Sequence, residues 1–280
     1  MAAYLLTALG GYLLLSACFT YAVHRIPRRP VDDRPDWGRV QDVRIPTHDG
    51  GFLEVWRVEP AGPSRGTVVL AHGWGRNRGR MVARARLFGR MGFTTVLHSA
   101  RDHGNSSPLK LMNAFRFAED VEAVLAWVGM PVLLYGHSAG AAGAVIAAAR
   151  NPEHIRLLFL EGCYARTKEA LARLYRSYNP VFGILFGYTV VAMMDVLYGF
   201  RMDRISPERL APGIDRPVLL IHGEKDQNFP VADARRLQRS FPSGRAELFV
   251  APGADHSSAS LDPAFPGVLA AFVDAHLDDC

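Results

Sequence analysis

One serine of the sequence stands in a setting that could turn its hydroxyl into a nucleophile. Ser138 is the central residue of G-H-S-A-G, residues 136–140. The apolar residues 132–135 before it predict a buried strand, and the alanine-rich residues 141–149 after it predict a helix. A sharp turn between a strand and a helix holds such a serine in a strained backbone, with its hydroxyl clear of the sheet. Because G-x-S-x-G is a common pattern, this prediction depends on the strand and the helix expected on either side of it.

A serine hydroxyl is a weak nucleophile unless a base takes its proton and a third group orients that base. His256 lies in the loop after the expected strand 246–250, and Asp226 lies in the loop after the expected strand 217–223. The carboxyl ends of parallel strands lie at one edge of a sheet. We therefore expect the side chains of Ser138, Asp226 and His256 to meet at this edge.

Two other carboxylates are alternatives to Asp226. Asp255 adjoins His256 in the sequence, but the side chains of adjacent residues rarely align with each other. Glu224 lies two residues before Asp226. We favour Asp226 because it occupies the position at the end of the strand.

The rest of the chain predicts an α/β fold. Residues 40–46 and 52–58 each alternate between apolar and polar residues around a turn, which predicts an antiparallel hairpin. Short apolar runs then alternate with helical segments, and this indicates a mostly parallel sheet covered by helices on both faces. The expected strands are 67–71, 94–98, 132–135, 155–160, 217–223 and 246–250, and the expected helices are 79–91, 115–128, 141–149, 231–240 and 263–277.

Residues 163–210 interrupt this alternation with helical and apolar sequence, and we expect an inserted cap there. Within it, residues 181–200 carry a single charged residue, Asp195, and are long enough to cross a membrane. One crossing would separate Ser138, before it, from His256, after it. We therefore expect this stretch to be a cap helix, with an apolar inner face that lines an acyl-binding pocket.

Several motifs together resemble those of one family. They are H-G-W-G at residues 72–75, R-D-H-G-N-S at 101–106, G-H-S-A-G at 136–140, H-G-E-K-D at 222–226 and D-H at 255–256. In this order they resemble the serine hydrolases of the α/β-hydrolase fold, of the esterase and lipase kind, over residues 40–278. Many relatives carry D-x-R-G-x-G-x-S in the second of these loops, and this chain departs from that pattern at Ser99 and Asp102.

The resemblance implies a role for each residue of the site. Ser138 would be the nucleophile, His256 the base and Asp226 the carboxylate that orients the base. The backbone N–H groups of Trp74 and Ala139 would form the oxyanion hole, and losing one such donor typically costs about a hundred- to a thousand-fold in rate.

Four residues are candidate substrate contacts. Phe186 and Met193 belong to the apolar cap stretch, and His137 and His103 belong to the motifs beside the serine. The alternative for these two histidines, and for His72, is a structural role or a position at the rim of the site without substrate contact.

The N-terminus predicts a membrane anchor. Residues 1–23 contain no charged side chain, and three arginines follow within residues 25–29. About 20 apolar residues can cross a bilayer as a helix, and the positive-inside rule then places the catalytic domain in the cytoplasm. We expect a single-pass anchor at 1–24, with residues 2–23 in the membrane, followed by a linker at 25–39 and a domain at 40–278. We also expect the domain to stay active when residues 1–30 are removed. The alternatives are export, either by secretion or with a lipid on Cys18, and an N-terminal helix that is buried in the domain.

Composition limits the remaining possibilities. The chain has 280 residues, 49% hydrophobic and 21% charged, enough for one large α/β domain, and its net charge is +5. Three distant cysteines suggest neither a disulfide framework nor a metal site, and we expect no metal and no cofactor. Six arginines within residues 76–90 indicate either a solvated helix face or contact with anions. Without interleaved aromatic residues they do not indicate nucleic-acid binding.

The sequence thus predicts a serine hydrolase that cleaves carboxylic esters of apolar or acyl-chain substrates through an acyl-enzyme. The expected partners are a small ester, of lipid-like type, and the membrane. A peptidase, amidase or thioesterase on the same scaffold is the first alternative. A hydrolase fold that only binds a partner is the second.

Overall fold

The computed structural model describes residues 1–277, so the last residue of the expected domain, 278, and Cys280 lie outside it. Eight strands form one sheet in the order β1-β2-β4-β3-β5-β6-β7-β8. The two pairs that involve β2 are antiparallel and the other five pairs are parallel. The strands are β1 (Arg39–Pro46), β2 (Phe52–Glu59), β3 (Thr67–Ala71), β4 (Thr94–His98), β5 (Val132–His137), β6 (Ile155–Glu161), β7 (Val218–Gly223) and β8 (Ala246–Ala251).

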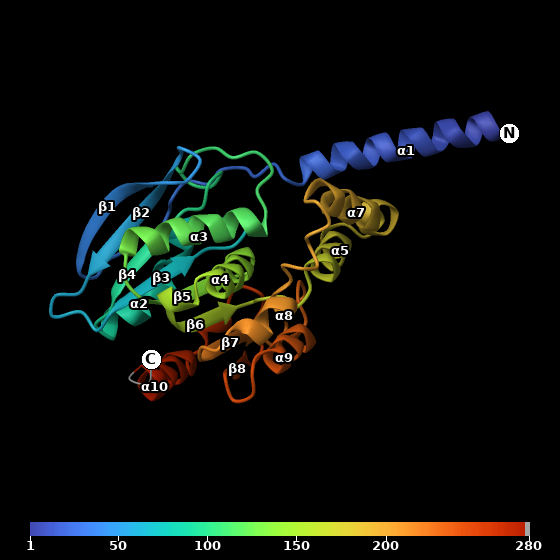
Figure 1. Ribbon diagram of the computed structural model, residues 1–280. Coiled ribbons are helices and arrows are strands. Elements are labelled where there is room, and N and C mark those ends of the chain that lie inside the picture. Colours follow the sequence, from blue (N-terminus) through green and yellow to red (C-terminus); the bar gives the residue numbers. More distant parts are fainter. Residues whose placement is uncertain (278–280) are drawn as a thin grey trace.

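Helices cover both faces of this sheet (Figure 1). On one face α3 (Ala114–Val128), α4 (Ala139–Arg150) and α9 (Val231–Ser240) pack against residues such as Val69 and Leu134. On the other face α2 (Val82–Arg90) and α10 (Phe265–His276) pack against Leu70 and Tyr135. Neighbouring residues of a strand thus face opposite layers, and the predicted α/β architecture is confirmed.

Short helical turns complete the outline. They are 3₁₀ helices at Arg78–Met81, Pro152–His154, Ala211–Gly213 and Ala259–Leu261. The first of them precedes α2, so the helix expected at 79–91 begins as a 3₁₀ turn.

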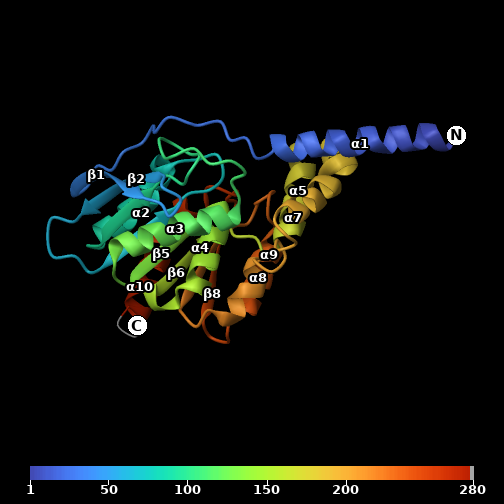
Figure 2. The same cartoon turned by 45° about the horizontal axis from the view of Figure 1, so that its top comes forward.

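Between β6 and β7 the chain forms a group of helices, for which we keep the name cap, residues 163–210. It contains α5 (Thr167–Tyr178), α6 (Pro180–Phe182), a π-helical turn (Gly183–Gly187), α7 (Tyr188–Leu197) and α8 (Pro207–Leu210). Figure 2 shows α5 and α7 standing off one end of the sheet, beneath the N-terminal helix.

The N-terminal helix α1 (Ala2–Ala22) extends beyond the rest of the molecule, and its second half lies over α7 (Figures 1 and 2). By length and composition, two helical stretches could cross a membrane, Ala2–Ala22 and Pro180–Leu197. A membrane position for α1 stays a prediction.

Candidate active site

Ser138 occupies a strained turn between β5 and α4. Its φ is 55° and its ψ is −117°, a conformation that side-chain-bearing residues rarely adopt. The two glycines of the motif make this turn possible. A Cβ atom on Gly136 would lie 2.5 Å from the Cα atom of Ala141, and one on Gly140 would lie 2.4 Å from the carbonyl oxygen of His72. The serine hydroxyl therefore stands at the carboxyl edge of the sheet.

The structure brings Ser138, His256 and Asp226 into hydrogen-bond contact. Ser138 Oγ lies 2.9 Å from His256 Nε2, and His256 Nδ1 lies 2.7 Å from Asp226 Oδ2. Since a carboxylate only accepts, Nδ1 donates to Asp226 and Nε2 is left to accept the serine proton. The other oxygen of Asp226 accepts the backbone N–H groups of Asn228 and Phe229, each at 2.9 Å. These bonds hold the carboxylate toward the histidine.

The alternative carboxylates face other groups. Asp255 accepts the N–H of Ser257 at 2.8 Å and the hydroxyl of Ser258 at 2.7 Å. Glu224 accepts the N–H of Gly253 at 2.8 Å. Of these three carboxylates, Asp226 is the one that hydrogen-bonds to the ring of His256.

A buried ion pair supports the loop that carries His256. Glu161, at the end of β6, is fully buried and pairs with two nitrogens of Arg84 at 2.7 and 2.8 Å. It also accepts the hydroxyls of Tyr135 at 2.9 Å and Ser260 at 2.8 Å. Burial alone would raise the pKa of Glu161, but the charge of Arg84 outweighs it and holds that pKa well below its ordinary value. The same guanidinium donates to the carbonyl oxygen of Ser257 at 3.0 Å.

The loop expected to form the oxyanion hole runs beside the serine. A Cβ atom on Gly73 would lie 3.1 Å from the Cβ atom of Ser138. The Gly75 N–H donates to His103 Nε2 at 3.1 Å. Ala139 begins α4, where the N–H groups of a helix lack partners within the helix. Trp74 and Ala139 line the same cavity as Ser138.

This cavity has a volume of about 150 Å³ and is walled mainly by the cap and by the start of α3. Its apolar lining includes Leu171, Leu174, Met194, Met202, Ile205 and Phe229. Ser138 is thus one of the few polar groups that face an apolar chamber, where a hydrocarbon chain can pack.

The candidate substrate contacts of the cap require correction. Phe186 stacks on Tyr12 of α1, with ring centroids 5.3 Å apart, and Met193 Sδ lies 3.8 Å from the hydroxyl of Thr20. Neither residue lines the cavity, whereas Met194 does. Adjacent helical residues point about 100° apart, so turning Met194 toward the cavity turns Met193 toward α1.

The two candidate histidines also lie outside the cavity lining. His137 is buried at the end of β5, and its Nε2 lies 3.1 Å from the carbonyl oxygen of His256. His103 Nδ1 donates to the carbonyl oxygen of Arg101 at 2.9 Å while Nε2 accepts from Gly75. Both side chains hold loops of the site in place, which is the structural alternative named for them above.

Comparisons with known proteins match this chain to one fold and to hydrolytic enzymes. Residues 62–195 match the family model described as "Serine aminopeptidase, S33". The chain is 26% identical to the monoacylglycerol lipase of Mycolicibacterium smegmatis over 238 residues, 72% of this chain and 84% of that one. It is 28% identical to the monoglyceride lipase of Rattus norvegicus over 268 residues, 82% of this chain and 87% of that one. The solved structure of the esterase Pf2001 of Pyrococcus furiosus matches with a TM-score of 0.72 at 19% identity, over 90% of this chain and 99% of that one.

The chain is a serine hydrolase with the α/β-hydrolase fold.

Two of the six arginines at 76–90 of this hydrolase are buried and differ from both expectations, whereas Arg90 is exposed. Arg78 is buried, lies 4.0 Å over the ring of Trp56 and pairs with Asp42 at 2.8 Å and Glu54 at 3.1 Å. Arg84 pairs with Glu161 as described above. These side chains tie α2 and its first turn to the sheet, and they are not available to solvent or to anions.

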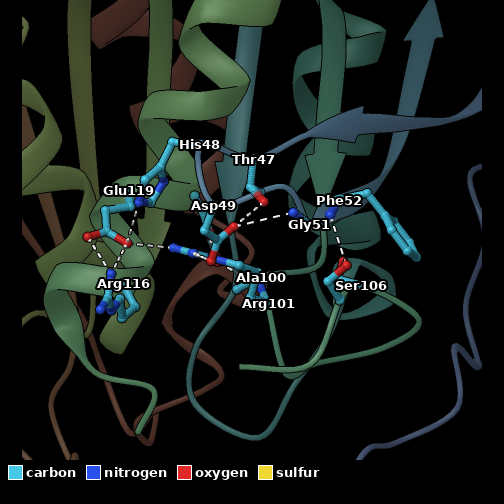
Figure 3. A network of polar contacts seen from close by, with 12 residues as sticks. Thr47, His48, Asp49, Gly51, Phe52, Ala100, Arg101, Ser106, Arg116 and Glu119 are labelled. Atoms are coloured by element: carbon cyan, nitrogen blue, oxygen red, sulfur yellow. Dashed lines mark hydrogen bonds and ion pairs between the residues drawn. The ribbon is translucent and has the colours of Figure 1, made fainter. Parts of the chain in front are cut away.

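A third buried arginine, Arg101, lies at the centre of a network of ion pairs in the loop that also carries His103; Figure 3 shows Arg101 and several of its partners. It pairs with Asp49 at 2.5 Å, Glu119 at 2.6 Å and Asp120 at 2.5 Å. The network joins the turn of the β1–β2 hairpin to α3. The sequence offered one signal for this role, because Arg101 belongs to the loop motif that the resemblance rests on.

Sequence reasoning missed three groups of this serine hydrolase. They are the Arg84–Glu161 pair, the inward residue Met202, and Val23, which also lines the cavity. Among residues 1–277, no three His, Cys, Asp or Glu side chains form a group that could hold a metal ion.

Proposed function

We propose that this serine ester hydrolase cleaves carboxylic esters of medium-length acyl chains, of the monoacylglycerol type, with Ser138, His256 and Asp226 as its catalytic triad. The observation that supports this most is the apolar cavity with Ser138 in its wall. An apolar acyl chain gains about 0.8 kcal/mol for each methylene that it buries, so such a chamber favours acyl chains over small polar acids.

The proposed reaction follows from the hydrogen bonds of the site. His256 Nε2 takes the proton of Ser138 as Oγ attacks the ester carbonyl, and Asp226 stabilises the imidazolium that forms. The N–H groups of Trp74 and Ala139 bind the oxyanion. The imidazolium then gives its proton to the leaving alcohol, which departs and leaves an acyl-enzyme on Ser138. Water, activated by the same histidine, hydrolyses this ester and restores the serine.

The size of the cavity limits the acyl chain. An engineered cavity of about 150 Å³ in another protein holds benzene, so the chamber here holds roughly six carbon atoms. A much longer chain requires the cap to move. We therefore place the preferred acyl chain in the medium range.

The relatives and the lining favour an ester over a peptide substrate. Two of the relatives above are named as lipases of monoacylglycerols, whereas the family description names an aminopeptidase. An aminopeptidase must bind the charged amine of its substrate, and a carboxylate is the usual partner for such a group. Among the described residues, those that line this cavity include no Asp or Glu.

We further propose that α1 is a single-pass anchor with the catalytic domain in the cytoplasm, as the arginines after it indicate. Export with a lipid on Cys18 would require cleavage before that residue. Cleavage there would remove Tyr12 and Ser16, which lie against the cap. The mass of the protein extracted from bacterial membranes tests this choice: an N-terminus that includes residues 1–17 supports it, and a lipid-modified chain that begins at Cys18 contradicts it.

A series of monoacyl esters from acetate to dodecanoate, each below its aggregation concentration, tests the proposed substrate. We expect kcat/KM to rise about fourfold per methylene, as 0.8 kcal/mol implies, until about six to eight carbons. Ser138→Ala should abolish all of this activity. A preference for acetate, or a flat profile, would contradict the proposal.

A further inference from the structure

The last turn of α1 enters the wall of the cavity that contains Ser138. Val23 lines this cavity together with Ser138. Phe19 and Val23 pack against a cluster of buried cap residues, Val190, Val191, Met194 and Met202. Two of these, Met194 and Met202, line the cavity as well. The end of the N-terminal helix and the cap therefore share one wall.

Polar side chains fix this contact along one face of α1. Ser16, Thr20 and His24 follow one another at intervals of four residues and are all buried. His24 Nδ1 donates to the carbonyl oxygen of Thr20 at 2.6 Å, so the Nε2 of the neutral ring accepts from the hydroxyl of Tyr198. Burial raises the pKa of Tyr198 to about 12, which keeps this donor protonated. Tyr198 itself lines the cavity.

The middle of α1 makes a second polar contact with the cap. The Tyr12 hydroxyl donates to the carbonyl oxygen of Leu185 at 2.8 Å and lies 2.5 Å from the hydroxyl of Thr189. Small and hydroxyl-bearing residues such as Ser16 and Thr20 allow two helices to approach closely in an apolar environment. The first turns of α1 differ, because Leu5, Leu6 and other large apolar residues there are exposed.

The chain after α1 is attached to the loops of the active site. Arg28 donates to the carbonyl oxygens of Gly104, at 3.1 Å, and Ser106, at 2.8 Å. The side-chain amide of Asn77 donates to the carbonyl oxygens of Arg29, at 3.0 Å, and Pro30, at 2.9 Å. The position of the helix end is therefore set on both sides, by the cap and by the loops next to the oxyanion segment.

We propose that the end of α1 and the turn that follows it, residues 19–24, form a wall of the acyl pocket and set which acyl chains the enzyme accepts. This inference rests on the proposed function. It makes α1 a specificity element as well as an anchor, and it revises the expectation that residues 1–30 can be removed without effect. Without them the cavity loses Val23 and the hydroxyl of Tyr198 loses its buried acceptor.

Substitutions that change the side-chain volume at Val23 test this proposal. The full-length protein in detergent micelles is assayed with the series of esters from acetate to dodecanoate. Val23→Trp should shorten the optimal chain by at least two carbons and reduce kcat/KM for octanoate at least tenfold more than for acetate. Val23→Ala should shift the optimum toward longer chains. Tyr21 lies on α1 two residues away and is exposed, so Tyr21→Trp and Tyr21→Ala are the matched controls and should keep the wild-type profile.

A double-mutant cycle at His24 and Tyr198 provides the second measurement. Tyr198→Phe and His24→Ala should each raise KM for octanoate several-fold, and the double variant should be no worse than the more severe single one, because both changes remove the same hydrogen bond.

The two proposals fail differently. An inactive wild type, or an active Ser138→Ala variant, would overturn the proposed function. An active wild type in which the Val23 variants keep the profile of the Tyr21 controls, or in which His24→Ala and Tyr198→Phe add fully, would overturn the role of α1 alone.

Discussion

Each residue of the proposed triad is held by its own local structure. Ser138 depends on two glycines without which the turn would clash, and Asp226 depends on two backbone N–H groups that fix its carboxylate. His256 relies on a loop whose carbonyl at Ser257 accepts from Arg84. The chemistry we propose therefore requires three positions that are fixed before substrate binds.

Substitution of single residues can test whether Asp226 or Asp255 is the carboxylate that orients His256. Asp226→Asn should lower kcat on a short ester by about a thousandfold or more, because the imidazole loses the carboxylate that orients and stabilises it. Asp255→Asn is the matched control and should lose less than tenfold, since the hydrogen bonds of the Asp255 carboxylate go to Ser257 and Ser258 of its own loop. Circular dichroism checks that both variants are folded. The opposite order of kcat values would show that Asp255 is the orienting acid.

At the scale of single residues the sequence predicted that three side chains would meet, but not which cap residues would face the pocket. Ser138, Asp226 and His256 follow strands whose apolar runs are unmistakable, so their meeting point could be predicted. Phe186 and Met193 belong to a stretch that is apolar on every side, and periodicity gives no inward face there. The π-helical turn Gly183–Gly187 also shifts the phase of the helix. Which cap residues face the pocket thus depended on packing against α1.

Among the elements, α2, β6 and the His256 loop are joined by the Arg84–Glu161 pair. Breaking a buried pair leaves an uncompensated charge, which typically costs about 3–5 kcal/mol. We expect Arg84→Met to lower the free energy of unfolding by about that amount and to reduce kcat as the His256 loop loosens. The measurement is urea unfolding in detergent, together with kcat on a short ester.

The double variant Arg84→Met/Glu161→Leu is the control for this prediction. It removes both charges, so it should recover much of the stability that Arg84→Met loses. It should not recover kcat, because the carbonyl of Ser257 still lacks its donor. A single variant within about 1 kcal/mol of the wild type would contradict the role given to this pair.

The order of the elements was largely predictable, and their arrangement was not. The strands of the sheet agree with the predicted ones to within about two residues, because short apolar runs between helical segments mark buried strands. The docking of α1 on α7 had no such signal. It rests on Tyr12, Thr20 and His24, three residues within an apolar segment, whose partners on the cap lie more than 150 positions away in the sequence.

For the whole molecule, four buried histidines predict sensitivity to acid. Burial lowers the pKa of His98, His103 and His137 to about 4, and it holds the pKa of His72 well below its ordinary value. Between pH 6.5 and 4 the unfolded chain binds protons that these folded imidazoles do not, so the free energy of unfolding falls as the pH falls. Each histidine contributes about 2 kcal/mol of this loss between pH 8 and pH 5. Asp120 acts in the opposite direction, because burial raises its pKa to about 7, but it is one group against four.

We therefore expect the midpoint of thermal unfolding to drop steeply below pH 6.5. Tryptophan fluorescence of the protein in detergent measures this midpoint. His98→Asn removes one of the four groups. It should make this drop less steep, because about one proton fewer is taken up when the chain unfolds. A midpoint that stays constant from pH 8 to pH 5 would contradict the account of these histidines.

The central claim is that Ser138 is a nucleophile activated by His256, and covalent labelling with a fluorophosphonate tests it most directly. Mass spectrometry of the digested wild-type protein should find the label on Ser138. His256→Ala should be labelled about a thousandfold more slowly, because the members of a triad act as a unit. Ser177 is exposed on α5, outside the cavity lining, so Ser177→Ala should be labelled like the wild type. Labelling that persists in Ser138→Ala at the wild-type rate, or a label found on another residue, would contradict the account.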